Sequence, residues 1–273
     1  MKWQTLLFSQ VSDQSVLAEQ IRANLKVQGY KPYDPFPGGL GSPIGKVLRL
    51  RMFLAPLHSR WARICIAPQD ELPHALLETL ELSGIFLQVL DDEAFKIQYI
   101  DAQNGVISSW QALEGFLAEG KTVADLEAAA QKPALIQKQS SSLNLPPDIE
   151  QMANAKGVNM TQVDKMMGKM TRRLLGKEQE SETLQQAKGS LSQTAAFDWN
   201  APSGQRLMAV MACLAVPQDY WREPSWDALT TAYQVARQRQ RGQGDLLPID
   251  ATALEAVPNA LEYTLLYFSK KIT

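Results

Sequence analysis

The sequence predicts an α+β fold in which an N-terminal mixed or antiparallel sheet carries helices on one face and is followed by an all-helical C-terminal domain. Apolar runs with a period of two recur up to about residue 107, which is typical of strands. Helical periodicities separate those runs and continue alone after a polar, proline-bearing stretch. At 273 residues the chain also suits two domains better than one.

We expect an α+β domain at residues 1–130, a linker at 131–147 and a helical domain at 148–273. The linker, QKPALIQKQSSSLNLPP, is polar and has no clear periodicity. A hydrophobic share of 45% with 21% charged residues is typical of a globular protein rather than of a disordered one.

The first domain is expected to alternate strands and helices. The strands are expected, in chain order, at residues 2–8, 45–55, 61–67, 85–90 and 95–100. One helix follows the first strand after a Ser12 or Asp13 cap and ends at Gly29, and a second helix spans 71–84. This order is satisfied by a sheet with helices on one face. Residues 32–43, PYDPFPGGLGSP, are too rich in proline and glycine for a regular element.

Every element after the linker is expected to be helical. Two prolines bracket a buried helix that contains LMAVMACLAV, and Ser225 caps the helix WDALTTAYQVARQRQR. The last helix is expected to begin near Pro258, because apolar residues follow at helical spacing. These apolar residues are Leu261, Leu265 and Phe268.

Charge is unevenly distributed along the chain, although the net charge is only −2. Residues 1–69 hold nine basic and three acidic residues (+6), and residues 70–131 hold two basic and twelve acidic residues (−10). These two blocks are expected to pack together and partly neutralise each other. Residues 132–181, with eight basic and five acidic residues (+3), alone are expected to offer an unpaired basic surface.

The sequence gives little support for catalysis, and no catalytic residue, metal ligand or cofactor is assigned. Cys65 and Cys213 stand in apolar runs and are expected to be small buried hydrophobes. His58 and His74 stand in no ligand-like spacing. The acidic cluster 91–93 lies between two strands, where three consecutive side chains diverge, so we expect a solvated turn.

The segment GGLGSPIGK does not satisfy the phosphate-binding P-loop pattern. Val47 stands where that motif has a hydroxyl residue, and a strand follows where the motif has a helix. A lid formed by residues 32–43 over a site at the domain junction keeps an enzyme as an alternative.

Residues 149–168, IEQMANAKGVNMTQVDKMMG, predict two short helices that meet at Gly157. Asn159 caps the second helix, and Ala153 supplies a small residue in the first. The segment resembles the helix-turn-helix motif of DNA-binding repressors. The resemblance implies that the second helix contacts bases and phosphates of nucleic acid. The residues concerned are Met160, Thr161, Gln162, Lys165, Lys169, Arg172 and Arg173.

Methionines in the same segment favour a different partner. Met166, Met167 and Met170 lie on the apolar side of the second helix, and unbranched thioethers adapt to varied surfaces. They predict a groove for a helix or peptide of a protein partner. Ordinary core packing is the third interpretation of this helix pair.

The leading expectation is a non-enzymatic binding or adaptor protein that recognises a macromolecule, with a protein as its partner. Nucleic-acid binding through residues 149–173 is one alternative, and an enzyme with a site near residues 32–43 is another. MKWQTLLFSQVSDQS carries no secretory signal, which indicates a cytoplasmic location. No membrane partner is expected, because the longest apolar run is about half as long as a bilayer requires.

Overall fold

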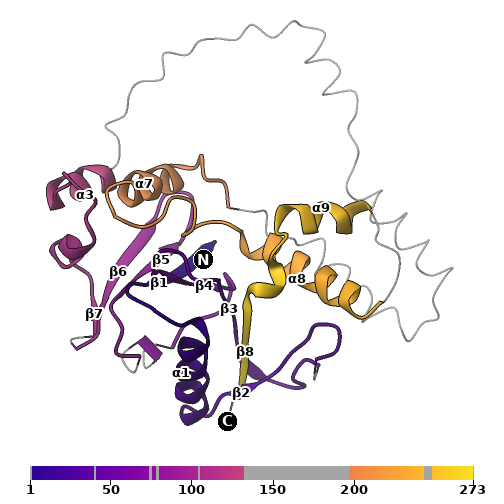
Figure 1. The fold of residues 1–273 in the computed structure, drawn as a ribbon. Helices are drawn as coiled ribbons and strands as arrows, with labels where there is room; N and C mark the ends of the chain where they lie inside the picture. The colour runs from indigo at the N-terminus through magenta and orange to yellow at the C-terminus, as the bar shows by residue number, and fades with distance from the viewer. Residues whose placement is uncertain are drawn as a thin grey trace, which may run out of the picture. The chain divides into compact units, whose positions relative to one another are not determined.

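The computed structural model describes residues 2–39, 41–73, 76–77, 80–103, 105–131, 197–242 and 248–272. These residues belong to one compact unit built from two stretches of the sequence, Met1–Lys132 and Ala196–Thr273. Its centre is an eight-stranded antiparallel sheet with the order β2-β8-β3-β4-β1-β5-β6-β7 (Figure 1).

The elements of this unit are mainly strands in the first stretch and mainly helices in the second. The strands are β1 (Trp3–Phe8), β2 (Lys31–Pro32), β3 (Val47–Leu54), β4 (Ala62–Ile66), β5 (Gly84–Val89), β6 (Phe95–Asp101), β7 (Gly105–Ile107) and β8 (Thr264–Lys271). The α-helices are α1 (Gln14–Val27), α3 (Val123–Ala130), α7 (Pro202–Met211), α8 (Trp226–Gln240) and α9 (Pro248–Ala256). Two 3₁₀ helices are η1 (Gln111–Phe116) and η2 (Ala260–Glu262).

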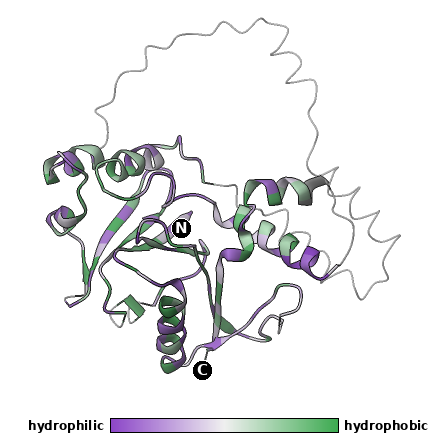
Figure 2. Cartoon of the chain, in the orientation of Figure 1, coloured by the Kyte–Doolittle hydropathy of each residue, from purple (hydrophilic) through white to green (hydrophobic). Residues whose placement is uncertain are grey.

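The first stretch folds largely as its periodicity predicts. β1, β3, β4, β5 and β6 coincide with the five expected strands. The carboxylate of Asp13 accepts hydrogen bonds from the backbone N–H groups of Ser15 and Val16 and so caps α1. Gly29 follows α1 with a φ of 84°, which glycine adopts without strain. Hydrophobic and hydrophilic residues alternate along α1 in Figure 2, as in a helix with one buried face.

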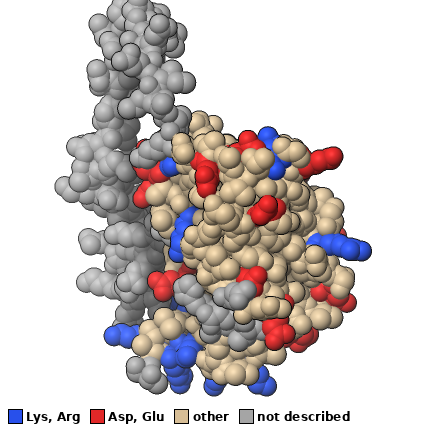
Figure 3. All heavy atoms as spheres, turned by 90° about the vertical axis from the view of Figure 1, so that its left-hand side faces the viewer, with Lys and Arg blue, Asp and Glu red and all other residues tan. Residues whose placement is uncertain are grey.

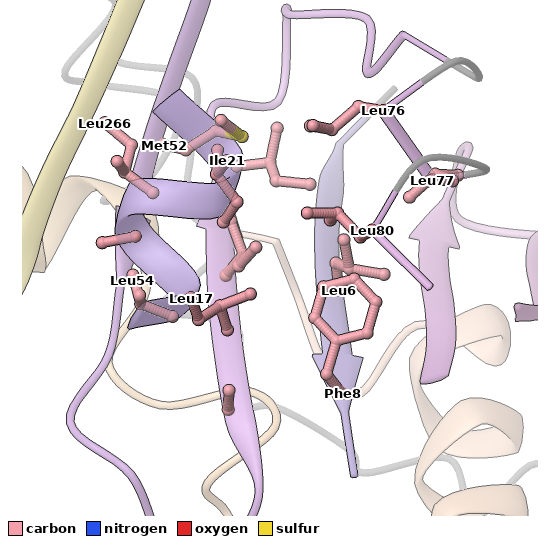
Figure 4. Close-up of a cluster of buried hydrophobic side chains, with 14 of the residues drawn as sticks. Leu6, Phe8, Leu17, Ile21, Met52, Leu54, Leu76, Leu77, Leu80 and Leu266 are labelled. Carbon is pink, nitrogen blue, oxygen red and sulfur yellow. The ribbon is translucent and has the colours of Figure 1, made fainter. Parts of the chain in front are cut away.

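One face of the sheet packs against α1 and against Leu76, Leu77 and Leu80. Leu17 and Ile21 of α1 lie against Met52, Leu54 and Leu266 of the sheet (Figure 4). Leucines from the segment where the second helix was expected complete this core, and Leu76 and Leu77 are helical there.

The opposite face is covered by helices of the second stretch, so the prediction of helices on only one face was wrong. Leu87 packs with Leu207 and Val210 of α7 in one buried cluster. Phe53 packs with Tyr233 of α8 in another. α7 and α8 therefore share their cores with the sheet.

The predicted all-helical C-terminal domain is wrong, because the last expected helix is the strand β8. β8 lies between β2 and β3 inside the sheet. Leu261, Leu265 and Phe268 have helical spacing, but Leu266 and Phe268 pack towards α1 whereas Tyr267 packs towards α8. Residues 266–268 in the middle of β8 are buried on both faces, so no alternating polar residue reveals its period of two there.

A buried arginine ties the connection between α7 and α8 to the sheet. Arg63 of β4 is 1% exposed. Its guanidinium donates hydrogen bonds to the hydroxyl of Thr5 at 3.2 Å, to the carbonyl of Glu223 and to the carbonyl of Pro224 at 3.1 Å. Its backbone N–H donates to the hydroxyl of Tyr220 at 3.0 Å. Arg63 has no ion pair within the described residues, so backbone carbonyl dipoles stabilise its charge.

Several smaller predictions are confirmed or corrected by the described residues. Cys65 and Cys213 are buried, and Asp91 accepts hydrogen bonds from the N–H groups of a tight β5–β6 turn. α7 begins at Pro202 as expected but ends at Met211, well before Pro217. Within the described part of the chain, no helix has the length and apolar character needed to cross a bilayer.

Candidate binding site

The binding residues predicted in segment 149–173 lie outside the described residues. The loop 32–43, where an enzyme site was the alternative, is described except for residue 40 and lies beside α8. His58 is exposed in the β3–β4 turn with its ring 5.4 Å from that of Tyr220. His74 lies outside the described residues. Within the part that is described, no group of three His, Cys, Asp or Glu side chains is placed to hold a metal ion.

A concentration of basic side chains lies where β2, β3 and β8 reach one end of the sheet. We call this set the basic end, and it consists of Lys31, Lys46, Arg49, Lys270 and Lys271. All five are exposed, and none forms an ion pair with a described residue. The basic end lies near the C-terminal label at the bottom of Figure 1, and Lys and Arg side chains line the corresponding lower edge in Figure 3.

The strand register explains why these charges gather. Arg49 of β3 is opposite Ser269 of β8, and Ser269 is opposite Lys31 of β2. Directly opposed residues project from the same face of a sheet. Arg49 and Lys31 therefore project from one face, separated by the small side chain of Ser269. Lys271, two residues along β8, extends the same face.

Exposed apolar side chains accompany the basic end. Ile44 is 97% exposed, Ile272 is 57% exposed and Leu48 is 50% exposed. Ile44 and Val47 also line a hollow of about 390 Å³ together with three lysines of the basic end. Lys270 also lies 5.6 Å from the ring centre of Tyr30. A surface that mixes exposed aliphatic groups with cations lacking an ion pair in the described part of the chain is suited to a partner that is itself both acidic and apolar.

A second hollow, the arginine pocket, adjoins the basic end and has a volume of about 300 Å³. It lies between β3, the loop that follows β2, and α8. Its lining residues are Tyr33, Pro35, Phe36, Ser42, Arg49, Arg51, Trp226, Thr230, Gln234 and Tyr267. Two arginines and no acidic residue line it, which suits a negatively charged group.

Arg51 is held in the pocket by Asp70. Its Nη2 donates to the Asp70 carboxylate at 2.8 Å, its Nε donates at 3.0 Å, and its backbone N–H donates at 2.6 Å. Hydrogen bonding to Asp70 raises the pKa of Arg51, so Arg51 stays charged. Because Asp70 neutralises much of that charge, Arg49 supplies most of the net positive potential of the pocket.

The loop that forms one wall of the pocket is fixed at both ends. Asp34 accepts a hydrogen bond from Arg237 of α8 at 3.1 Å and another from the N–H of Phe36 at 3.0 Å. The Gly41 N–H donates to the carbonyl of Asp34 at 2.8 Å and closes the loop. The wall is therefore held against α8 rather than hanging free, which does not favour the lid that the loop's composition suggested.

The tyrosine hydroxyls of the pocket have raised pKa values and are neutral at neutral pH. Burial raises the pKa of Tyr33 above its ordinary value, although the nearby positive charge of Arg51 opposes the shift. Burial also raises the pKa of Tyr267. Neutral phenols and guanidinium groups can hold a carboxylate.

Sequence reasoning missed this site, although the basic charge of the first 69 residues pointed to it. The +6 charge of residues 1–69 was expected to be neutralised by the following acidic block. Two ion pairs do join those blocks, Lys2–Asp92 at 2.7 Å and Arg51–Asp70 at 2.8 Å. The exposed cations at the start of β3 form no ion pair with a described residue. Two lysines of β8 lie beside them, and the sequence did not predict the position of β8.

Comparisons with protein-family models, with curated proteins and with solved structures found no match for the chain. The geometry and chemistry of the basic end and the arginine pocket are therefore the basis for assigning a function.

Proposed function

We propose that this protein is a non-enzymatic binding protein that recognises an acidic segment of a protein partner at the basic end of its sheet. The observation that carries the proposal is the presence of five exposed cations with no ion pair among the described residues, next to three exposed aliphatic side chains. Unpaired like charges on neighbouring strands repel each other, and an acidic ligand relieves that repulsion.

A protein is favoured over nucleic acid at this site because of the aliphatic residues. Ile44, Leu48 and Ile272 are exposed among the cations, and apolar contacts stabilise a peptide with apolar side chains but not a phosphate backbone. Nucleic-acid binding through residues 149–173 remains the alternative that the sequence suggests, and it involves a different part of the chain.

The test uses the full-length protein and a fluorescein-labelled peptide of about ten residues in which glutamate and valine alternate, long enough to span a strand. Binding is followed by fluorescence anisotropy at low and high salt. We expect the affinity to fall with increasing salt, because added ions shorten the Debye length and weaken the attraction between exposed charges.

Matched double variants locate the binding surface. Lys31→Glu with Arg49→Glu is expected to weaken binding about ten-fold or more, because each reversal replaces an attraction by a repulsion. Lys96→Glu with Lys121→Glu makes the same change of charge at exposed positions away from the basic end and is expected to leave binding nearly unchanged. Equal losses in both double variants contradict the proposal. So does tighter binding of mixed-sequence duplex DNA at the residues of the basic end.

A further inference from the structure

β3 extends beyond its neighbour β4 at the basic end. β3 pairs with β8 from Val47 to Leu54, whereas it pairs with β4 only from Met52 to Leu54. The first residues of β3 therefore have a neighbouring strand on one side only.

The hydrogen bonds around Arg51 show which backbone groups face the open side. The Arg51 N–H donates to the Asp70 carboxylate, and the Arg51 carbonyl accepts from the Ala67 N–H at 3.0 Å, both on the β4 side. Backbone groups of a strand alternate in direction, so the N–H and C=O groups of Val47 and Arg49 face that same side. No described residue pairs with them there. The open edge is therefore formed by Val47 and Arg49. It ends at Arg51, whose backbone N–H donates to the carboxylate of Asp70 instead of to a strand.

The side chains beside the open edge define what kind of strand fits it. Arg49 and Arg51 project from the α8 face, because Arg51 is opposite Tyr267, which packs against α8. Leu48 projects from the α1 face and is half exposed. A strand beside β3 would place every second side chain next to the arginines and the others next to Leu48.

We propose that the partner segment binds as an added strand beside Val47–Arg49, with acidic residues facing the arginines and apolar residues facing Leu48. This inference rests on the proposed function and specifies its mode. Backbone pairing supplies part of the affinity, and the alternating side chains supply the specificity. A side chain directly opposite Arg49 has its Cβ about 5 Å away, so its carboxylate is within reach of Arg49 and of the mouth of the arginine pocket.

The first experiment changes one backbone donor of the open edge. Val47→Pro removes the N–H that faces the empty side, and proline is tolerated at the first residue of a strand and on edges that face solvent. Val47→Ala keeps the N–H and serves as the matched control. For the alternating glutamate–valine peptide, we expect the dissociation constant of Val47→Pro to exceed that of Val47→Ala by about three- to ten-fold, the loss of one hydrogen bond.

The second experiment changes the ligand pattern at constant charge. A peptide with the same glutamates in one block and the same valines in another cannot present acidic and apolar side chains on opposite faces of a strand. We expect it to bind more weakly than the alternating peptide. Amide hydrogen exchange of the full-length protein is expected to slow at Val47 and Arg49 by ten-fold or more when the alternating peptide is saturating, since only paired amides are protected.

The outcomes separate this inference from the proposed function. Binding that depends on Lys31 and Arg49 but leaves both amides exchanging at their free rate, with Val47→Pro equal to Val47→Ala, overturns the added strand and keeps the acidic partner. If neither peptide binds the wild-type protein in low salt, both proposals are overturned. Slowed exchange at the two amides supports the inference even if Val47→Pro fails to fold.

Discussion

The buried guanidinium of Arg63 allows a sharp test of how the two stretches of the chain are joined. In Arg63→Met the side chain keeps most of its aliphatic volume but loses its hydrogen bonds. The hydroxyl of Thr5 remains satisfied, because it also donates to the carbonyl of Ile64 at 3.0 Å. The carbonyls of Glu223 and Pro224 lose the donor that reaches them from β4.

The magnitude follows from those two carbonyls. A fully buried acceptor left without a donor costs about 1–3 kcal/mol. Glu223 is exposed and Pro224 is half-buried, so water replaces part of the lost hydrogen bonding and the lower end of that range applies to each carbonyl. Removing the charge also removes its own desolvation cost, which offsets part of the loss. We therefore expect Arg63→Met to lower the free energy of unfolding by about 1–2 kcal/mol, since the carbonyls cannot be removed with the charge.

Urea denaturation of the full-length protein measures this change, provided that the slope with denaturant stays constant. Arg22→Met is the matched control, because Arg22 lies on the exposed side of α1 in a surface pair with Glu19. It is expected to change the free energy of unfolding by no more than about 0.5 kcal/mol. A loss below about 1 kcal/mol for Arg63→Met would refute the view that backbone carbonyls depend on this arginine.

Three further predictions concern packing, pH and the site. Gly84→Ala should lower the free energy of unfolding by about 1–3 kcal/mol in urea melts, because the new Cβ would overlap the carbonyl of Leu7. Gly115→Ala is the control and should not lower it, because nothing lies within 4 Å of its added Cβ. Burial raises the pKa of Tyr263 to about 12, so its contribution to stability is present below the unfolded pKa of about 10 and is lost as the pH rises towards 12. A pH series of urea melts should show this loss, and Tyr263→Phe should reduce it. Asp70→Asn removes the charge that neutralises Arg51, so anisotropy titrations should show the acidic peptide binding about three-fold more tightly.

The parts of the fold that the sequence predicts are α1, which has a one-sided pattern, and strands whose apolar runs are bounded by turn residues. These strands include β1 and β4, which are buried on both faces. α1 has a polar face and a capping aspartate, and the β3–β4 and β5–β6 hairpins have runs of suitable length separated by turn residues. Periodicity, capping residues and turn residues lie within an element or next to it, so the local sequence is enough to predict the element.

β8 escaped prediction because its partners are far away in the sequence. Its two buried faces result from α1 on one side and α8 on the other, and neither contact leaves a periodic mark within the strand. Predicting a helix in place of β8 also prevented prediction of the candidate site. Lys270 and Lys271 lie beside Leu48 and Val47 only because β8 pairs with β3. The arginine pocket is formed by β3, the loop after β2 and α8, which are far apart in the sequence. No local motif therefore predicts it.

The position of β8 between β2 and β3 has a consequence for the order in which the sheet is completed during synthesis. β3 is synthesised early, whereas β8, the strand that pairs with one of its sides, is synthesised near the end of the chain. Val47 pairs with Lys271, for example. Until then a nascent chain carries β3 with an uncovered flank along its whole length, and exposed flanks of this kind attract other extended chains. Cells that make this protein would therefore be expected to shield the growing polypeptide with chaperones, and any interruption of synthesis before β8 should yield material that aggregates rather than a smaller folded product.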